Sequence, residues 1–172
     1  STDGMFTSCE SLTTIDVSKW DTSTITSINN MFNRCQNLVS LDVSRWDTSK
    51  VKNMNSVFVL CPKLQTLDVS KWDTSNVTSL EYMCYYAEAL KKLDVSKWDT
   101  SKVTNMNQMF RNSIKLKSLD VSKWNVSKLE LANEMFEGVG LETIDVSKWD
   151  TSKVTNMANL FYYCSSLPEI DV

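Results

Sequence analysis

The chain has 172 residues, of which 42% are hydrophobic and 23% are charged, so disorder and a fibrous composition are both excluded. Its 18 Lys and Arg residues against 21 Asp and Glu give a net charge of −3, whereas a protein that binds a polyanion normally carries excess positive charge. Histidine is absent, which removes the commonest general base and every zinc site that contains His. No apolar run approaches membrane-spanning length. We therefore expect no enzyme, no cofactor or metal, no nucleic-acid partner and no segment inserted into a membrane.

One five-residue motif, Asp-Val-Ser-(Lys/Arg)-Trp, recurs along the whole chain. Its copies begin at Asp16, Asp42, Asp68, Asp94, Asp120 and Asp145, with Asp171-Val172 starting another, and the spacing is constant except for the interval from Asp120 to Asp145, which is one position shorter. All six tryptophans fall in one column: Trp20, Trp46, Trp72, Trp98, Trp124 and Trp149. Such a period is typical of stacked units that bury one another's faces. We expect residues 1–172 to form a single solenoid domain, as a fragment of a longer array.

The copy after Trp98 shows the pattern within one unit. Residues 99–101, Asp-Thr-Ser, are of the type that caps a helix, and residues 103–110 have apolar spacings of 3, 3 and 1, which suit a short helix or 3₁₀ turn. Residues 119–122 alternate between apolar and polar, as a short strand does. The pattern predicts an α/β, leucine-rich-repeat-like solenoid of about six coils, with a parallel strand ladder on one side and short helices on the other.

The single short spacing places a deletion in one loop. The missing residue lies between Phe136 and Leu141, where Gly138 and Gly140 stand. Flexible backbone is where a shortened loop is absorbed most easily.

Two rows of residues carry a family resemblance. The row at 116, 119, 121 and 124 resembles the strand of a leucine-rich repeat, with Trp124 where that family usually has Asn. A longer and more specific pattern is similar to the 26-residue BspA-like leucine-rich repeats of bacterial surface proteins and mycoplasma lipoproteins; it reads Trp98-Asp99-Thr100-Ser101-x-Val103-Thr104-Asn105-Met106-x-x-Met109-Phe110. The resemblance implies an extracellular, cell-surface array for adhesion or binding of host or neighbouring proteins, without known chemistry.

The tryptophan column has two interpretations. An exposed aromatic stripe could grip sugar rings, whereas a buried ladder would only stabilise the stack. The column continues the interior phase of Leu119 and Val121, and six exposed tryptophans in line would form an unusual apolar patch. We therefore favour a buried structural ladder.

The cysteines favour buried free thiols over disulfides or zinc. Cys9, Cys35, Cys61 and Cys164 share a column that elsewhere holds Ala87, Ser113 and Val139, which describes a small interior slot. Cys84 stands instead in the phenylalanine column. The number of cysteines is odd and no Cys-x-x-Cys occurs, so zinc is disfavoured. An extracellular location would normally favour disulfides, and the redox state of the first three stays open.

Two polar columns invite other hypotheses. The aspartates of the motif could share calcium ions, but the glycine-rich turns of calcium-binding β-rolls are absent. We favour mutual neutralisation of the aspartates by a row of cations three residues further on: Lys19, Arg45, Lys71, Lys97, Lys123 and Lys148. The threonine column is similar to an ice-binding array only in its regularity, and caps and turns explain it as well: Thr22, Thr48, Thr74, Thr100 and Thr151.

A specific partner requires positions that differ between copies. The two residues after the phenylalanine column vary most. We therefore hypothesise a partner-binding surface of Tyr-rich and apolar side chains flanked by arginine, formed by Val59, Leu60, Tyr82, Tyr85, Tyr86, Arg34 and Arg111. The sequence predicts a non-enzymatic, surface-displayed module for protein–protein interaction or adhesion, with a carbohydrate-binding or passive spacer module as the alternative.

Overall fold

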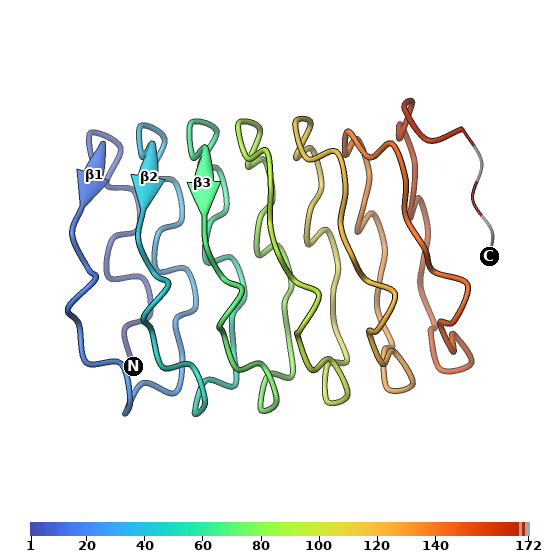
Figure 1. The fold of residues 1–172 in the computed structure, drawn as a ribbon, viewed down its shortest axis with the longest axis horizontal. Helices are drawn as coiled ribbons and strands as arrows, with labels where there is room; N and C mark the ends of the chain where they lie inside the picture. The colour runs from blue at the N-terminus through green and yellow to red at the C-terminus, as the bar shows by residue number, and fades with distance from the viewer. Residues whose placement is uncertain (169, 171–172) are drawn as a thin grey trace.

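The computed structural model describes residues 1–168 and 170, and the chain forms a row of stacked coils, one for each sequence repeat (Figure 1). The last motif, Asp171-Val172, lies outside the described residues. Three two-residue strands, β1 (Thr14–Ile15), β2 (Ser40–Leu41) and β3 (Thr66–Leu67), form a parallel sheet in the order β1-β2-β3. Residues one repeat apart are paired in this sheet, Thr14 with Ser40 and Ser40 with Thr66. Sequence columns are therefore physical rows.

The expectation of an α/β, leucine-rich-type solenoid with helices on one side is wrong. Within residues 1–168 and 170 there is no helix, and β1–β3 are the only strands of two residues. In the predicted helix at 103–110, every second backbone N–H group points toward the next coil of the stack. Those of Met106, Gln108 and Phe110 donate to carbonyls of the next coil at 2.8–3.0 Å. These donors cannot form the bonds along the chain that define a helix.

The apolar spacing of three arises from a run of turns. The N–H of Met109 bonds the carbonyl of Met106, and that of Ser113 bonds the carbonyl of Phe110. Between these turns the backbone enters the left-handed region, at Gln108 (φ 52°) and Asn112 (φ 59°), which no helix allows. The same two positions have positive φ in every coil; the first row is Gly4, Asn30, Ser56, Tyr82, Gln108, Glu134 and Asn159, and the second is Ser8, Arg34, Leu60, Tyr86, Asn112, Gly138 and Tyr163.

The tryptophans form a continuous stack through the core. Neighbouring indole rings have centroids 6.3–6.5 Å apart and interplanar angles of 1–7°. Trp46, Trp72, Trp98 and Trp124 are each 3% exposed, whereas Trp20 and Trp149 are half-buried. Each indole N–H from Trp46 onward donates to a valine carbonyl of the preceding coil, as Trp72 does to Val43 at 3.2 Å. The indole N–H thus provides a hydrogen bond to a valine carbonyl that lies just after the position where the short strands end, outside their pairing.

The motif aspartates close turns within their own coil. Asp68 Oδ1 accepts hydrogen bonds from the N–H and the hydroxyl of Ser70, at 3.1 and 2.7 Å, and the same pair of contacts recurs at every described copy. These contacts lower the pKa of the Asp68 carboxyl. The aspartate row is therefore an Asx-turn row that ends the strands.

The threonines expected at helix caps join coils instead. Thr48, Thr74 and Thr100 are nearly fully buried, and each hydroxyl donates to a carbonyl of the following coil at 2.9–3.0 Å. Because no helix begins there, the cap interpretation is wrong. These hydroxyls are internal cross-links of the stack.

The short spacing lies at Gly140. Asn105 pairs with Leu131, a full repeat away, whereas Ser118 pairs with Thr143, one position less than a full repeat away. Buried Val139 and Leu141 enclose a single residue, where the preceding coil has two, Ile114 and Lys115. A Cβ at Gly140 would lie 2.1 Å from the carbonyl oxygen of Ile114, so only glycine fits this tight corner.

Candidate functional site

Three tyrosines, Tyr82, Tyr85 and Tyr86, lie together at the surface of one coil, and we call them the tyrosine cluster. The rings of Tyr82 and Tyr85 meet edge to face with centroids 5.6 Å apart, and those of Tyr85 and Tyr86 are 4.6 Å apart. All three are half-buried. Partial burial raises the pKa of the Tyr82 and Tyr85 hydroxyls, so at neutral pH both remain protonated and can donate hydrogen bonds.

The backbone holds two members of the cluster in the left-handed region. Tyr82 has φ 57° and Tyr86 has φ 56°, at rows where other coils have Gly4 and Gly138. A bulky side chain at such a position costs about 1–2 kcal/mol relative to glycine. Between Tyr82 and Tyr85 stand Met83 and Cys84, which are fully buried and anchor the coil in the core.

Arg111 extends the cluster onto the next coil but is already paired. Its guanidinium lies 6.0 Å from the centroid of the Tyr85 ring, within cation–π range. The same group bonds Glu134, and its Nη2 lies 2.8 Å from Oε1 of Glu137, which is only 7% exposed. Arg111 therefore fixes Tyr85 in place, and its charge is balanced within the molecule.

The remaining predicted residues lie on the other side of the cluster. The N–H of Leu60 donates to the carbonyl of Tyr85 at 2.8 Å, so these two coils are in direct contact. Leu60 is half-buried, whereas Val59 is buried at 9% exposure and adds little to the surface. Arg34 is exposed one coil further away, and its N–H bonds the carbonyl of Val59. The structure thus brings the seven predicted residues onto four consecutive coils.

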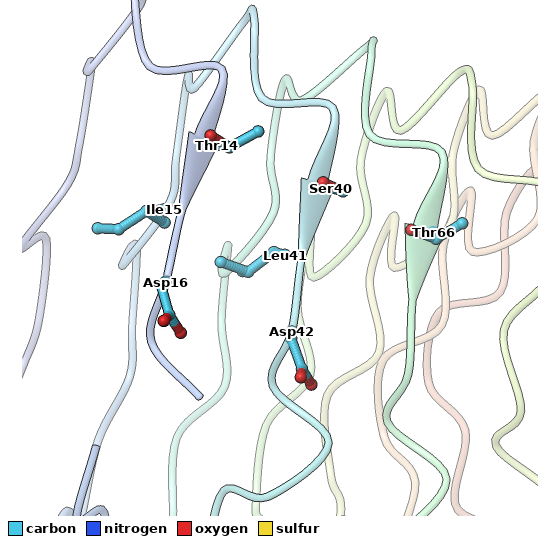
Figure 2. Close-up of a pocket in the computed structure, with 7 residues that line it drawn as sticks. All are labelled: Thr14, Ile15, Asp16, Ser40, Leu41, Asp42 and Thr66. Atoms are coloured by element: carbon cyan, nitrogen blue, oxygen red, sulfur yellow. The ribbon is translucent and has the colours of Figure 1, made fainter. Parts of the chain in front are cut away.

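A second candidate is a shallow hollow of about 390 Å³ over the three strands (Figure 2). It is lined by the hydroxyl residues Thr14, Ser40 and Thr66 and by Asp16 and Asp42. In Figure 2 the two carboxylates project side by side from successive coils. Each already accepts two hydrogen bonds from its serine, which lowers its pKa. Among residues 1–168 and 170, no three Cys, Asp or Glu side chains are grouped to hold a metal ion.

The five cysteines, all within the described part of the chain, are free thiols. Four are buried and Cys9 is half-buried. The thiols of Cys35, Cys61 and Cys164 donate to phenylalanine carbonyls of the preceding coil at 2.9–3.2 Å. Burial raises the pKa of Cys35 to about 11 and that of Cys84 to about 12, so both stay protonated at neutral pH. Such thiols are poor nucleophiles.

The sequence hypothesis left out two exposed features. Tyr162 and Tyr163 form a second ring pair, with centroids 4.1 Å apart and exposures of 50% and 71%. They occupy the same two variable rows as Tyr85 and Tyr86, so that signal was available in the sequence. A group of lysines beside the strands, centred on Lys91 and Lys92, was also missed.

A family model described as "Mycoplasma protein of unknown function, DUF285" matches the chain twice, over residues 1–93 and residues 90–171. The two matches together span nearly the whole sequence. No curated protein sequence matches the chain, and no solved structure does. In residues 1–168 and 170, no helix has the length and apolar character needed to cross a membrane.

Proposed function

The chain belongs to the DUF285 family, and on that premise we propose that it is a non-enzymatic, surface-displayed repeat module that binds a protein partner through the tyrosine cluster. The finer assignment to BspA-like adhesion repeats is part of this proposal. The extracellular location is part of it as well.

The observation that carries the proposal is the clustering of Tyr82, Tyr85 and Tyr86 at a surface. Tyrosine supplies a large contact area at low cost in side-chain entropy, and its hydroxyl adds directional hydrogen bonds. The ring contacts and the Arg111 guanidinium limit the motion of Tyr85 before any partner arrives. Rigid aromatic side chains of this kind are typical of the central residues of protein interfaces.

The alternative functions predict a different use of the surface. Sugar binding by the tryptophan column would require exposed indole faces, and Trp46, Trp72, Trp98 and Trp124 are each 3% exposed. This disfavours the carbohydrate alternative in the form in which the sequence suggested it. A passive spacer requires no particular residue in the variable rows, so it predicts that changes at the tyrosine cluster have no effect on binding.

The test is binding of the chain to a panel of purified host surface and matrix proteins, measured by biolayer interferometry. The test variant is Tyr85→Ser/Tyr86→Ser, and the matched control is Tyr162→Ser/Tyr163→Ser, in the same two rows of another coil. We expect the test variant to lose at least tenfold in affinity for a partner that the wild type binds, because a central aromatic residue contributes about 2 kcal/mol or more.

Both variants must first retain the tryptophan fluorescence and the cooperative unfolding of the wild type. Equal affinity of wild type and test variant for every bound protein would refute the role of the cluster. Equal loss in both variants would mean that tyrosines on this surface act without regard to position, which also contradicts the proposal.

A further inference from the structure

Over residues 1–168, one hydroxyl row beside the strands is interrupted in a single coil. The row reads Thr14, Ser40, Thr66, Lys92, Ser118 and Thr143, so every described copy has Thr or Ser except the fourth. The neighbouring row has Gln65, then Lys91 and Lys117, then Glu142. Because a repeat protein gains specificity only where copies differ, this coil is a marked position in its hydroxyl row.

The hydrogen bonding between coils is interrupted at the same place. On the N-terminal side, the N–H of Gln65 donates to the carbonyl of Val39, and on the C-terminal side that of Glu142 donates to Lys117. Within the described residues, 91–93 form no bridge with either neighbouring coil and no backbone–backbone hydrogen bond. The core beneath is intact, since Leu93 is 5% exposed. The missing backbone hydrogen bonds therefore affect only the surface of the stack, and the core stays packed.

Hollows flank this break on both sides. One, of about 310 Å³, is lined by Gln65, Thr66, Leu67, Asp68, Lys91 and Lys92. The other, of about 430 Å³, is lined by Lys91, Lys92, Lys115, Lys117 and Ser118. Lys117 pairs with Glu142 at 3.3 Å, but among the described residues Lys91, Lys92 and Lys115 have no carboxylate within ion-pair distance. We call these four lysines the lysine break.

We propose that the lysine break binds a short acidic segment of a protein partner, in extended conformation. Three uncompensated ammonium groups on two adjacent coils provide the charge complementarity. The lysine stems and Leu67 provide apolar walls for the peptide backbone and side-chain methylenes. The backbone N–H groups of the exposed Lys91 and Lys92, which no backbone carbonyl accepts, are further donors for carboxylates or for peptide carbonyls.

The surroundings favour a short peptide over a long polyanion. Asp68, Asp94 and Asp120 lie in the row beside the lysines, on the same and the adjacent coils. Their carboxyl pKa values are lowered by the serine contacts, so all three are charged at neutral pH. A polyanion running along the stack would lie beside this negative row on every coil it passes, whereas two or three acidic side chains at the lysine break lie beside only its nearest members.

The experiment measures the fluorescence anisotropy of labelled hexaglutamate at low salt, with heparin oligosaccharide as a second probe. The test variant is Lys91→Gln/Lys92→Thr, which installs the pair found at Gln65-Thr66 in the preceding coil and is therefore compatible with the fold. The matched control is Lys97→Gln/Lys123→Gln, which removes the same charge from exposed positions of another row.

We expect hexaglutamate to bind the wild type, to be released as salt is raised, and to bind the test variant several-fold more weakly, with the control unchanged. The proposal is overturned if hexaglutamate does not bind, or if both variants lose the same affinity, since net charge alone would then explain the result. Tighter binding of heparin than of hexaglutamate at the same lysines would also overturn it, in favour of a polyanion site. This test does not involve the tyrosine cluster, so either proposal can fail alone.

Discussion

The shortened corner at Gly140 allows a sharp test of the coil packing. In Gly140→Ala the new methyl group would lie 2.1 Å from the carbonyl oxygen of Ile114 and 3.0 Å from its carbon. Ordinary contacts begin at 3.4 Å, so the methyl group and the oxygen would have to move well apart. The obstacle is backbone, and it is held in place, because the N–H of Ser113 bonds Phe110 and its hydroxyl bonds the carbonyl of Cys84 at 2.9 Å.

We expect Gly140→Ala to destabilise the chain by about 3 kcal/mol, at the upper end of the usual cost of overpacking, because no side chain can rotate away. The measurement is guanidinium unfolding followed by the fluorescence of the stacked tryptophans. Gly138→Ala is the matched control. Its methyl group would clash only with the side chain of Asn112, whose oxygen would lie at 2.3 Å, and its φ of +65° adds the left-handed cost.

That control is expected to cost about 1–2 kcal/mol, most of it for the left-handed conformation. Adding Asn112→Ala should recover the part due to the contact. No second substitution of a side chain should rescue Gly140→Ala. A Gly140→Ala variant within about 0.5 kcal/mol of wild type, the range of an ordinary surface substitution, would show that the two coils do not approach as closely as described.

Two further predictions concern features shared by many coils. Ser56 has φ 59°, so Ser56→Val should be less stable than Ser56→Gly by about 2 kcal/mol in the same unfolding assay; equal stability would contradict the left-handed conformation. Serine contacts hold the pKa of Asp68 below its unfolded value, so the unfolded state binds protons first as the pH falls. The stabilisation is complete above the ordinary aspartate pKa of about 3.9 and is lost through the lower, folded pKa. Ser70→Ala should raise the Asp68 pKa, measured by NMR titration, and weaken the acid dependence of unfolding.

Reasoning by columns works here because one repeat returns the chain to the same place. The position of the tryptophans, for example, followed from the phase set by Leu119 and Val121, and the stacked indoles occupy the core. The location of the deletion also followed from a change in spacing. Both are consequences of period alone, which does not depend on the local conformation of the backbone.

The prediction from the sequence was wrong for the local conformation of the backbone, because the pattern indicated helices. Apolar residues three apart fit a helix, but they fit successive turns equally well, and Asp-Thr-Ser is as suited to an Asx turn as to a helix cap. The deciding fact is the bonding of alternate N–H groups to the next coil, as at Met106 and Gln108. These hydrogen bonds join residues of different coils, so the sequence of a single repeat does not show whether they form. Left-handed positions occupied by Tyr82 or Leu60 have no signature in sequence, because such residues rarely adopt positive φ.

The candidate surfaces divide in the same way. Variation between copies was enough to find the tyrosine cluster, and it could also have found the lysine break, because Lys92 interrupts a row that holds Thr or Ser in the three coils before it and the two coils after it. What the sequence could not supply is the state of each charge. Arg111 and Lys92 are both cations in variable positions, yet only the first is neutralised by neighbouring glutamates.

The coils are joined in both directions by different groups. Indole N–H and cysteine S–H groups donate to the coil before, whereas the N–H groups of the turn segment and the buried threonine hydroxyls donate to the coil after. Excising or duplicating any window of one full repeat therefore reunites each donor with an equivalent acceptor, wherever the cut falls. A cut of any other length must be absorbed within one turn, as the missing residue is at Gly140. The gene for such a chain can grow or shrink by whole repeats through recombination, and new binding surfaces can arise in the spare copies while the scaffold is maintained.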